Sequence, residues 1–150
     1  MTDLSDLFPQ SFRDDFASRN IQKGSVIRVF VRDTTPPKIK RFVVVGFSQD
    51  KVLLGTVFIN SEINPNIFRT EELRNLHVPL DAQIHNFIDH DCFVDCSSIK
   101  ERSFEEIKQL LSNDPECSKG MVSENTMEEI IQTIKSAITI SPSQKRKFGL

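Results

Sequence analysis

Residues 38–62, KIKRFVVVGFSQDKVLLGTVFINSE, contain the pattern that decides the fold. Val43–Val45 form a β-branched run that Gly46 closes, and Val52–Ile59 form a second apolar run. Runs this apolar suit strands that are covered on both faces, whereas a helix of the same length would be marginal. The stretch therefore predicts a hairpin of two buried strands, joined by a tight turn at residues 49–51.

The two ends of this predicted hairpin carry polar and charged side chains. Lys38, Lys40 and Arg41 precede the first apolar run, and Asn60 and Ser61 follow the second. Rigid elements often display binding residues at their ends, and a guanidinium matches phosphate oxygens because it donates in a planar fork. Two interpretations of the basic group stay open: a phosphate-binding site and the solvated start of a strand.

The composition is that of an ordinary globular chain. Its 150 residues are 38% hydrophobic and 27% charged, which favours one domain that buries roughly two-thirds of its unfolded surface. The net charge is −2, so any attraction for nucleic acid has to be local. Three cysteines do not make a disulfide framework, and no signal peptide or apolar run of membrane-spanning length stands out. We therefore expect a soluble, cytoplasmic protein without membrane contact.

An amphipathic pattern precedes the first predicted strand. Helical spacing relates Leu4, Leu7, Phe8, Phe12 and Phe16. We predict an N-terminal helical arm over residues 1–22 and one barrel domain with a C-terminal helix over residues 23–150. The arm is expected to pack its phenylalanines on the domain or on a sister subunit, and a dedicated partner-binding helix is the alternative.

Further strands and helices follow from changes in the hydrophobic period. Strands are predicted over residues 25–31, around residues 76–80, within residues 87–96 and at residues 119–122. One helix is predicted from Ser103. A second is predicted along the apolar stripe of Met127, Ile130, Ile131, Ile134 and Ile138. Pro142 is expected to end this second helix, and the basic run 145–147 is expected to be a solvated tail. Because loops rather than helices separate the strands, the expected fold class is α+β, with a small, strongly bent antiparallel β-barrel.

The order of these features resembles the PemK/MazF family of bacterial toxins. The matching features are a turn glycine before the first strand, Arg41 at the start of a valine-rich strand, Asn60–Ser61 after the next strand, a later strand with Cys96 near its end, and Lys119–Val122 before an amphipathic helix. The resemblance extends over residues 24–140, and the order of several motifs carries it.

This resemblance implies a homodimeric, barrel-like ribonuclease that cleaves single-stranded RNA without a metal ion or other cofactor. In such enzymes the ribose 2′-hydroxyl attacks the adjacent phosphate, an arginine stabilises the pentavalent phosphorane, and a general base and acid move the protons. By this resemblance Arg41 stabilises charge, Ser61 and Asn60 bind the phosphate, and Lys38 and Lys40 add phosphate-binding charge. An antitoxin-like protein partner is implied as well.

One part of the expected site departs from the family pattern. Family toxins tend to carry an acidic residue followed by glutamine after the cysteine-containing strand, whereas this chain has Ser97–Ser98. A serine hydroxyl is a poor general base without an activating partner. Asp95 lies two residues before Ser97, on the same face of a regular strand, so Asp95 is the candidate base and Ser97 a candidate phosphate ligand.

Histidines and cysteines are the remaining candidates for chemistry. His85, His90, Cys92 and Cys96 invite a metal interpretation, but Cys92 and Cys96 on one strand would have Sγ atoms roughly 13 Å apart, too far to share a zinc ion. We therefore expect core cysteines, surface histidines and no metal site. Cys117 is expected in a polar, exposed loop.

Two functions from different classes remain as hypotheses. The first is a metal-independent endoribonuclease of a toxin–antitoxin system, with Arg41, Ser61 and Asp95 as catalytic residues. The second is a catalytically inactive member of the fold that binds protein or nucleic acid. The serines after Cys96, Phe42 in place of the family's proline and the acidic net charge favour the second.

Overall fold

The structure is a computed structural model that describes residues 10–32, 36 and 38–150. Its strands are β1 (Ser25–Val31), β2 (Lys38–Phe47), β3 (Leu53–Asn60), β4 (His77–Leu80), β5 (Cys92–Asp95), β6 (Lys100–Ser103) and β7 (Ser118–Met121). Its helices are α1 (Gln10–Arg19), α2 (Glu71–Arg74), α3 (Phe104–Asn113), α4 (Glu124–Ser136) and α5 (Pro142–Lys147), with a short 3₁₀ helix at Pro115–Cys117. Within this part of the chain, no helix is both long enough and apolar enough to cross a membrane.

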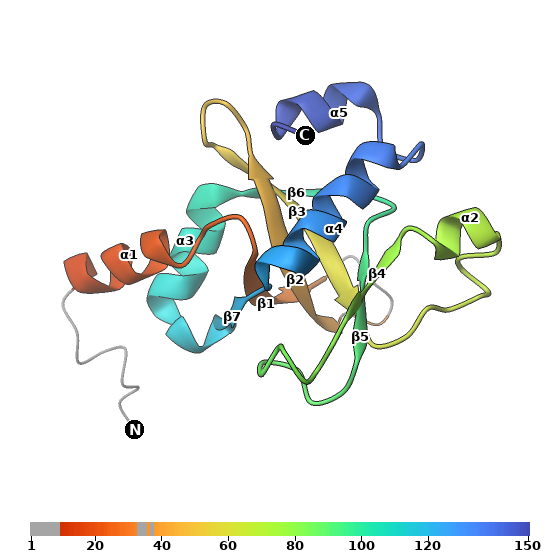
Figure 1. The fold of residues 1–150 in the computed structure, drawn as a ribbon. Helices are drawn as coiled ribbons and strands as arrows, with labels where there is room; N and C mark the ends of the chain where they lie inside the picture. Colours follow the sequence, from red (N-terminus) through yellow and green to blue (C-terminus); the bar gives the residue numbers. More distant parts are fainter. Residues whose placement is uncertain (1–9, 33–35, 37) are drawn as a thin grey trace.

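The strands form one curled antiparallel sheet, which α1 and α3 flank on one side and α4 crosses in front (Figure 1). The strand order is β4-β5-β3-β2-β1-β7, and β6 pairs with β3 beyond the end of β5. Among the described residues, β4 and β7 end the ladder and do not pair with each other, so the sheet is an open half-barrel. The expected α+β class and bent antiparallel sheet are confirmed, whereas a closed barrel is not.

The predicted hairpin forms as β2 and β3. The two strands pair antiparallel, with Val43 opposite Val57. In the turn between them, Asp50 Oδ1 accepts hydrogen bonds from Ser48 Oγ at 2.6 Å and from the Val52 N–H at 3.1 Å. An aspartate that binds the backbone two residues further on is a typical turn residue, so the local sequence explains the reversal of the chain.

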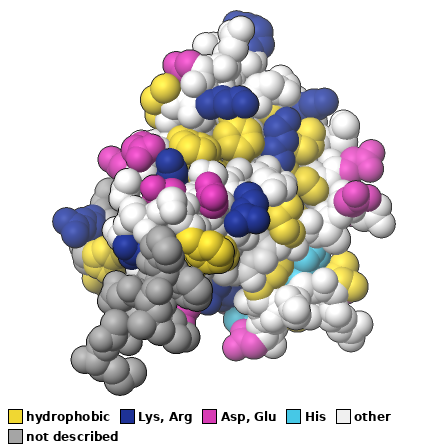
Figure 2. Space-filling view, turned by 90° about the vertical axis from the view of Figure 1, so that its left-hand side faces the viewer, with side chains coloured by type: hydrophobic (Ala, Val, Ile, Leu, Met, Phe, Trp, Pro, Cys, Tyr) yellow, Lys and Arg dark blue, Asp and Glu magenta, His cyan; other side chains and the backbone are white. Residues whose placement is uncertain are grey.

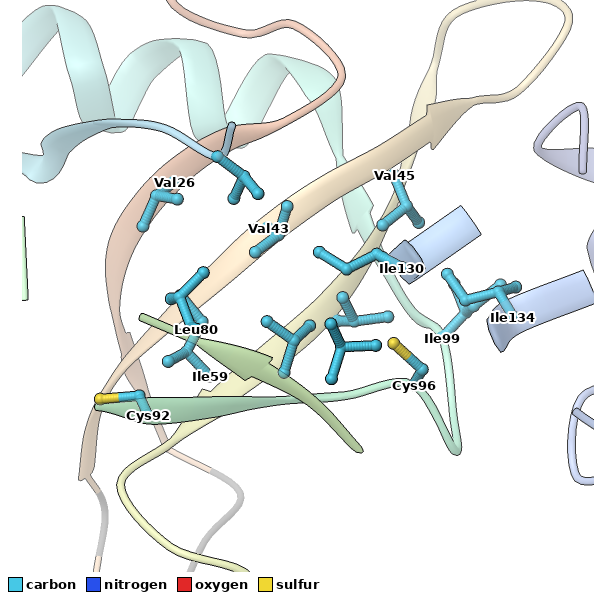
Figure 3. Packing of buried hydrophobic residues seen from close by; sticks show 14 of the residues in the cluster. Val26, Val43, Val45, Ile59, Leu80, Cys92, Cys96, Ile99, Ile130 and Ile134 are labelled. Atoms are coloured by element: carbon cyan, nitrogen blue, oxygen red, sulfur yellow. The ribbon is translucent and has the colours of Figure 1, made fainter. Parts of the chain in front are cut away.

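Both faces of the sheet are covered, as the apolar runs predict. One face, which we call the α4 face, carries Val43 and Val45 and packs against α4, as Figure 3 shows. The opposite face, the α3 face, carries Phe42 and Val44 and packs against α1 and α3. Because successive strand residues point to opposite sides, the consecutive valines of β2 belong to two separate cores.

Helix α4 confirms the last predicted helix but ends before the predicted stripe does. Ser123 caps its N-terminus by accepting a hydrogen bond from the N–H three residues further on, at 3.3 Å. Ile130 and Ile134 are fully buried against the sheet. The helix ends at Ser136, and Ile138 is 94% exposed. The prediction that Ile138 belongs to the buried stripe is therefore wrong.

The C-terminal residues form helix α5 and not a solvated tail. Pro142 is the first residue of α5, where a missing N–H leaves no helical hydrogen bond unmade, so it begins a helix and does not end one. Lys145 Nζ donates to two carbonyl groups at the C-terminal end of α4, at 2.9 and 2.8 Å. Lys147 forms an ion pair with Glu101 at 2.7 Å. These contacts fold the basic run back onto the domain.

Phe148 explains the two glycines at the centre of the hairpin. Gly46 pairs with Gly55 across β2 and β3, and Phe148, which is 1% exposed, lies against both. A Cβ atom on Gly55 would stand 2.9 Å from the Phe148 ring, and one on Gly46 would stand 2.3 Å from the Phe148 carbonyl oxygen. Glycine inside a strand marks such a close approach of other atoms. Gly46 is thus a packing position within β2, which continues to Phe47 beyond the valine run.

Helix α1 packs into the domain. Ala17 and Ile21 are buried in the core on the α3 face, and Ser112 of α3 donates a hydrogen bond to Asp14 at 3.0 Å. Phe12, by contrast, is 49% exposed. A helix is confirmed over residues 10–19, but its fully buried residue is an alanine, and a separate arm that packs through phenylalanines is not confirmed. The other predicted arm residues, Leu4, Leu7 and Phe8, lie outside the described residues.

The segment between β3 and β5 contains less strand than predicted. Residues 71–74 form α2, and β4 is confined to residues 77–80. A loop replaces the first half of the strand expected before Cys92. His85 holds this loop inward, because its Nε2 accepts a hydrogen bond from the Ser123 N–H at 3.1 Å. His85 is only 2% exposed, so the prediction of a surface histidine is wrong there.

Candidate functional site

Two hollows flank the start of β2. The first, which we call the lysine hollow, has a volume of about 690 Å³ and is bordered by Lys38, Lys40, Asn60, Ser61, Asp95 and Ser97. The second, the arginine hollow, has a volume of about 450 Å³ and is bordered by Arg28, Ile39, Arg41, Phe87, Asp89 and Lys119. Arg41 and Ile39 also reach the border of the lysine hollow, so all seven site residues predicted from the sequence touch it.

The β2–β3 ladder sets Lys40 beside Asn60 on the α3 face. Arg41 pairs with Ile59, so Lys40 and Asn60 are the next positions along the ladder, and alternation points both side chains to the same side. Lys40 Nζ donates a hydrogen bond to Asn60 Oδ1 at 2.7 Å. The same ammonium lies 5.3 Å from the centre of the Phe58 ring. Lys40 is therefore held over the end of the hairpin.

Cations dominate the electrostatics of the lysine hollow. Burial lowers the pKa of the Lys40 ammonium below its ordinary value of 10.5, the charge of Lys38 lowers this pKa further, and the Asp95 carboxylate raises it. Lys38 and Lys100 border the same hollow and are exposed. An ammonium with a lowered pKa releases its proton more readily, so Lys40 is suited both to hold an anion and to protonate it.

Asp95 and Ser97 lie together, as predicted, although Ser97 lies beyond the end of β5. Val94 pairs with Ile59, which puts Asp95 beside Phe58 on the α3 face. Asp95 Oδ1 accepts hydrogen bonds from Ser97 Oγ at 2.5 Å and from the Ser97 N–H at 3.0 Å. These two bonds fix the orientation of the carboxylate. Its Oδ2 atom makes no hydrogen bond with a described residue.

His77 belongs to this site, although the sequence analysis did not select it. It stands opposite Asp95 in the β4–β5 ladder, its side chain is fully buried, and its Nε2 lies 3.8 Å from Asp95 Oδ1. Its Nδ1 contacts the carbonyls of Leu73 and Arg74 at 3.2 Å, whereas Nε2 has no hydrogen-bond partner in the described part of the chain. Phe68 covers the imidazole, with ring centres 4.3 Å apart. The pairing of β4 with β5 depends on strand register, which the local pattern does not reveal.

The rim of the lysine hollow adds a hydroxyl, and a further cation lies beside Phe58 on β6, outside the border of this hollow. Ser61 follows β3, is exposed, and makes no side-chain hydrogen bond with a described residue. Arg102 lies 5.6 Å from the centre of the Phe58 ring and 5.5 Å from that of Phe42. Arg102 could not be selected from the sequence, because β6 has no apolar alternation. Figure 2, which views the side of α1 and α3, shows lysines and arginines bordering apolar side chains.

The guanidinium of Arg41 is directed away from the other predicted site residues. Alternation puts its side chain on the α4 face, where Nη1 donates a hydrogen bond to the Phe87 carbonyl at 3.0 Å. It stands opposite Arg28 in the β1–β2 ladder, and Lys119 of β7 borders the same hollow. The structure thus brings six predicted residues together and does not bring the guanidinium of Arg41 to Ser61.

The three cysteines of the chain are free and buried. Burial raises the pKa of the Cys96 thiol to about 12, and the nearby charge of Asp95 adds to the rise. Burial also raises the pKa of Cys117, which is 5% exposed and packs in the core on the α3 face. The prediction that Cys117 is exposed is wrong. Among the described residues, no three His, Cys, Asp or Glu side chains are grouped as metal ligands.

Comparison of the sequence with protein families and with curated proteins identifies no relative. No model of a known protein family matches the chain, and a search of the curated proteins finds no match. The residues of the two hollows are therefore the basis on which a function can be inferred.

Proposed function

We propose that the chain binds single-stranded RNA in the lysine hollow and cleaves it as a metal-independent endoribonuclease. The observation that carries the proposal is the grouping of Lys40, Asn60, Asp95 and Ser97 in one hollow. They supply an ammonium, an amide, a carboxylate and a hydroxyl. Binding a phosphodiester and moving protons around it require groups of these kinds.

Charge and apolar surface together support the binding of a single strand. Lys38, Lys40 and Lys100 supply ammonium groups for phosphate oxygens. Ile67 and Phe68 border the same hollow and offer apolar surface on which an unpaired base can lie. A duplex keeps its base faces stacked, so this apolar surface favours a single strand.

The proposed reaction is a transfer within the RNA strand. The Asp95 carboxylate takes the proton of a ribose 2′-hydroxyl while its oxygen attacks the adjacent phosphorus. The new O2′–P bond forms as the P–O5′ bond breaks, and the leaving 5′-oxygen takes a proton from the Lys40 ammonium. Asn60 and Ser61 donate to the phosphate oxygens, while Ser97 keeps its hydroxyl hydrogen bond to Asp95. The products are a 2′,3′-cyclic phosphate and a 5′-hydroxyl.

The test is cleavage of unstructured RNA by purified protein in EDTA, with end-group analysis of the products. Asp95→Asn keeps an acceptor for the Ser97 bonds but removes the base, so we expect the rate to fall by about 10²-fold or more while RNA affinity changes little. Lys40→Gln should lower both affinity and rate. Matched controls are Asp15→Asn on α1 and Lys135→Gln on α4, both exposed and outside the hollow.

A 2′-deoxy oligonucleotide of the same sequence separates binding from reaction. The proposal expects this oligonucleotide to bind and stay intact, because it lacks the attacking hydroxyl. Cleavage of the 2′-deoxy strand, or loss of RNA cleavage in EDTA, contradicts the proposed mechanism. Failure of the wild-type protein to bind any single-stranded RNA contradicts the proposed function as a whole.

One observation favours a second function, a binding module without catalysis. Arg41 donates to the Phe87 carbonyl on the α4 face, so the guanidinium that the family resemblance assigns to the phosphorane does not face Asp95. A protein that binds RNA tightly and leaves it intact in every buffer would have this second function. In that case Asp95→Asn would change neither affinity nor the state of the RNA.

The proposal extends to the biological setting of a toxin–antitoxin system. A homodimeric ribonuclease of this kind should arrest growth when it is expressed alone, and an antitoxin-like protein should relieve the arrest. Asp95→Asn should be tolerated at the same expression level. Equal tolerance of the wild-type chain and this variant would contradict the toxin part of the proposal.

A further inference from the structure

The arginine hollow lies on the other side of β2 and carries a second concentration of positive charge. Arg28 and Arg41 stand directly opposite each other in the β1–β2 ladder, and Lys119 of β7 borders the same space. Asp89 is the one acid on its border among the described residues. The hollow therefore has an excess of cations, although the chain as a whole has a net charge of −2.

The charges of the arginine hollow are only partly balanced within the protein. Like charges at opposed positions of neighbouring strands destabilise the pair. Among the described residues, the Arg28 guanidinium pairs with the Asp114 carboxylate at 3.8 Å and donates a weak hydrogen bond to Cys117 Sγ at 4.0 Å. The side chain of Lys119 makes no hydrogen bond or ion pair with a described residue. A cationic pair that the fold balances so weakly indicates that an anion from outside completes it.

The floor of the hollow is preformed. Arg41 donates one hydrogen bond to the Phe87 carbonyl and keeps further N–H groups of its planar fork. Phe87 in turn packs against Gly120, where a Cβ atom would stand 2.9 Å from the ring. Gly120 has a φ of +147°, a conformation that other residues rarely adopt. The loop, β2 and β7 are thus locked together around the cations.

The two hollows share bordering residues at the start of β2. Ile39 and Arg41 border both of them, and Ile39 is 66% exposed between them. The side chains of Lys38 and Lys40 point to the α3 face, and those of Ile39 and Arg41 to the α4 face. A flexible polyanion that lies across the start of β2 can therefore contact both hollows.

We propose that the arginine hollow binds the backbone phosphates of the nucleotides that flank the segment in the lysine hollow. This inference rests on the proposed function, because it concerns the same RNA strand. Arg28 and Arg41 suit phosphate oxygens because each guanidinium donates two parallel hydrogen bonds, and Lys119 adds a point charge. The arginine hollow therefore increases the affinity for longer RNA strands, whereas cleavage takes place at Asp95 in the lysine hollow.

The experiment compares 2′-deoxy oligonucleotides of about 4 and about 12 nucleotides, a range that single-strand sites cover, at several salt concentrations. The variants are Arg28→Gln/Lys119→Gln and Lys119→Gln alone, with Lys135→Gln/Arg146→Gln as a control of equal charge change. For the longer strand, losing two phosphate contacts should reduce the slope of log affinity against log salt by about 1.4, and losing one by about 0.7.

The shorter strand identifies which hollow is affected. Its affinity should stay unchanged in the two Lys119 variants and fall with Lys40→Gln. An equal effect of the control variant on the longer strand, or a loss of the shorter strand with the Lys119 variants, overturns the inference and leaves the proposed function standing. Failure of the wild-type protein to bind either strand overturns the proposed function. Lys119→Gln breaks no side-chain hydrogen bond or ion pair with a described residue, so it keeps the test valid even where Arg28→Gln impairs folding.

Discussion

Phe148 should contribute more to stability than any other residue of the C-terminal segment. Its ring is 1% exposed and packs in the core of the α4 face, over the position where Gly46 pairs with Gly55. Truncating a fully buried phenylalanine removes its transfer free energy and leaves a cavity, which together cost about 3–5 kcal/mol. We therefore expect Phe148→Ala to lower the free energy of unfolding by that amount.

A substitution at Gly55 tests whether the effect arises from the packing of Phe148 against this glycine. A Cβ atom on Gly55 would meet the Phe148 ring at 2.9 Å, so Gly55→Ala should overpack the site and cost about 1–3 kcal/mol. In a Phe148→Ala background that clash has no partner, and the same Gly55→Ala change should cost less than about 0.5 kcal/mol. The two substitutions should therefore be non-additive by about 1–3 kcal/mol.

Urea unfolding followed by circular dichroism measures these changes, since the chain has no tryptophan to report by fluorescence. Ile138→Ala is the control, because Ile138 is 94% exposed and its loss should stay within about 0.5 kcal/mol. The denaturant slope should not change, so that the midpoint alone reports stability. A cost below about 1 kcal/mol for Phe148→Ala, or full additivity with Gly55→Ala, would refute the assignment of Phe148 to the core.

Three further predictions follow from the contacts of single residues. His85→Phe leaves the Ser123 N–H unsatisfied at the start of α4 and should cost about 1–3 kcal/mol in urea unfolding. The hydrogen bond from Lys147 lowers the pKa of Glu101, so its stabilising effect is full above pH 4.5 and fades as the pH falls through the lower folded-state pKa. Glu101→Gln should remove this small acid dependence from a pH series of unfolding midpoints. Cys96, with a pKa of about 12, should resist alkylation at pH 8 until urea exposes it, and fast labelling of the native protein would contradict its burial.

The spacing of hydrophobic residues predicted the strands and helices in which buried and exposed positions follow a regular pattern. Val43–Val45 and Val52–Ile59 became β2 and β3, and the stripe around Ile130 became α4. Ser123 caps α4, and a capping hydroxyl acts within one turn. In each case the interaction that decides the structure lies within a few residues of chain, which is the range that a sequence pattern covers.

Contacts between distant segments could not be predicted in the same way. The sequence around Phe148 is basic and short, and its burial depends on a chain reversal that Pro142 begins. The signal that could have found it was the presence of two strand-interior glycines, Gly46 and Gly55. His77 was missed for a related reason: the alternation in β4 assigns it to the polar side, but the Phe68 ring covers that side.

The identity of the cation facing Asp95 depends on one irregularity in β2. Gly46 pairs with Gly55, and counting a regular ladder from there would set Arg41 opposite Asn60. The register shifts between Val44 and Gly46, which inserts one extra residue into β2. Because side chains alternate with a period of two, this one extra residue exchanges the faces on which Lys40 and Arg41 lie. It places the Lys40 side chain, and not the Arg41 guanidinium, in the lysine hollow.

The same irregularity explains how one short basic run can line two hollows. Without the bulge Arg41 would meet the groups that the family resemblance predicts for it, and Lys40 would lie on the α4 face. With the bulge, Arg41 lies opposite Arg28 on the α4 face. Lys40, whose pKa is lowered, lies near Asp95 on the α3 face. The division between a hollow for chemistry and a hollow for phosphate binding therefore follows from strand register. In a folded variant that lacks Val45, Lys40 and Arg41 should exchange the faces of the sheet on which their side chains lie.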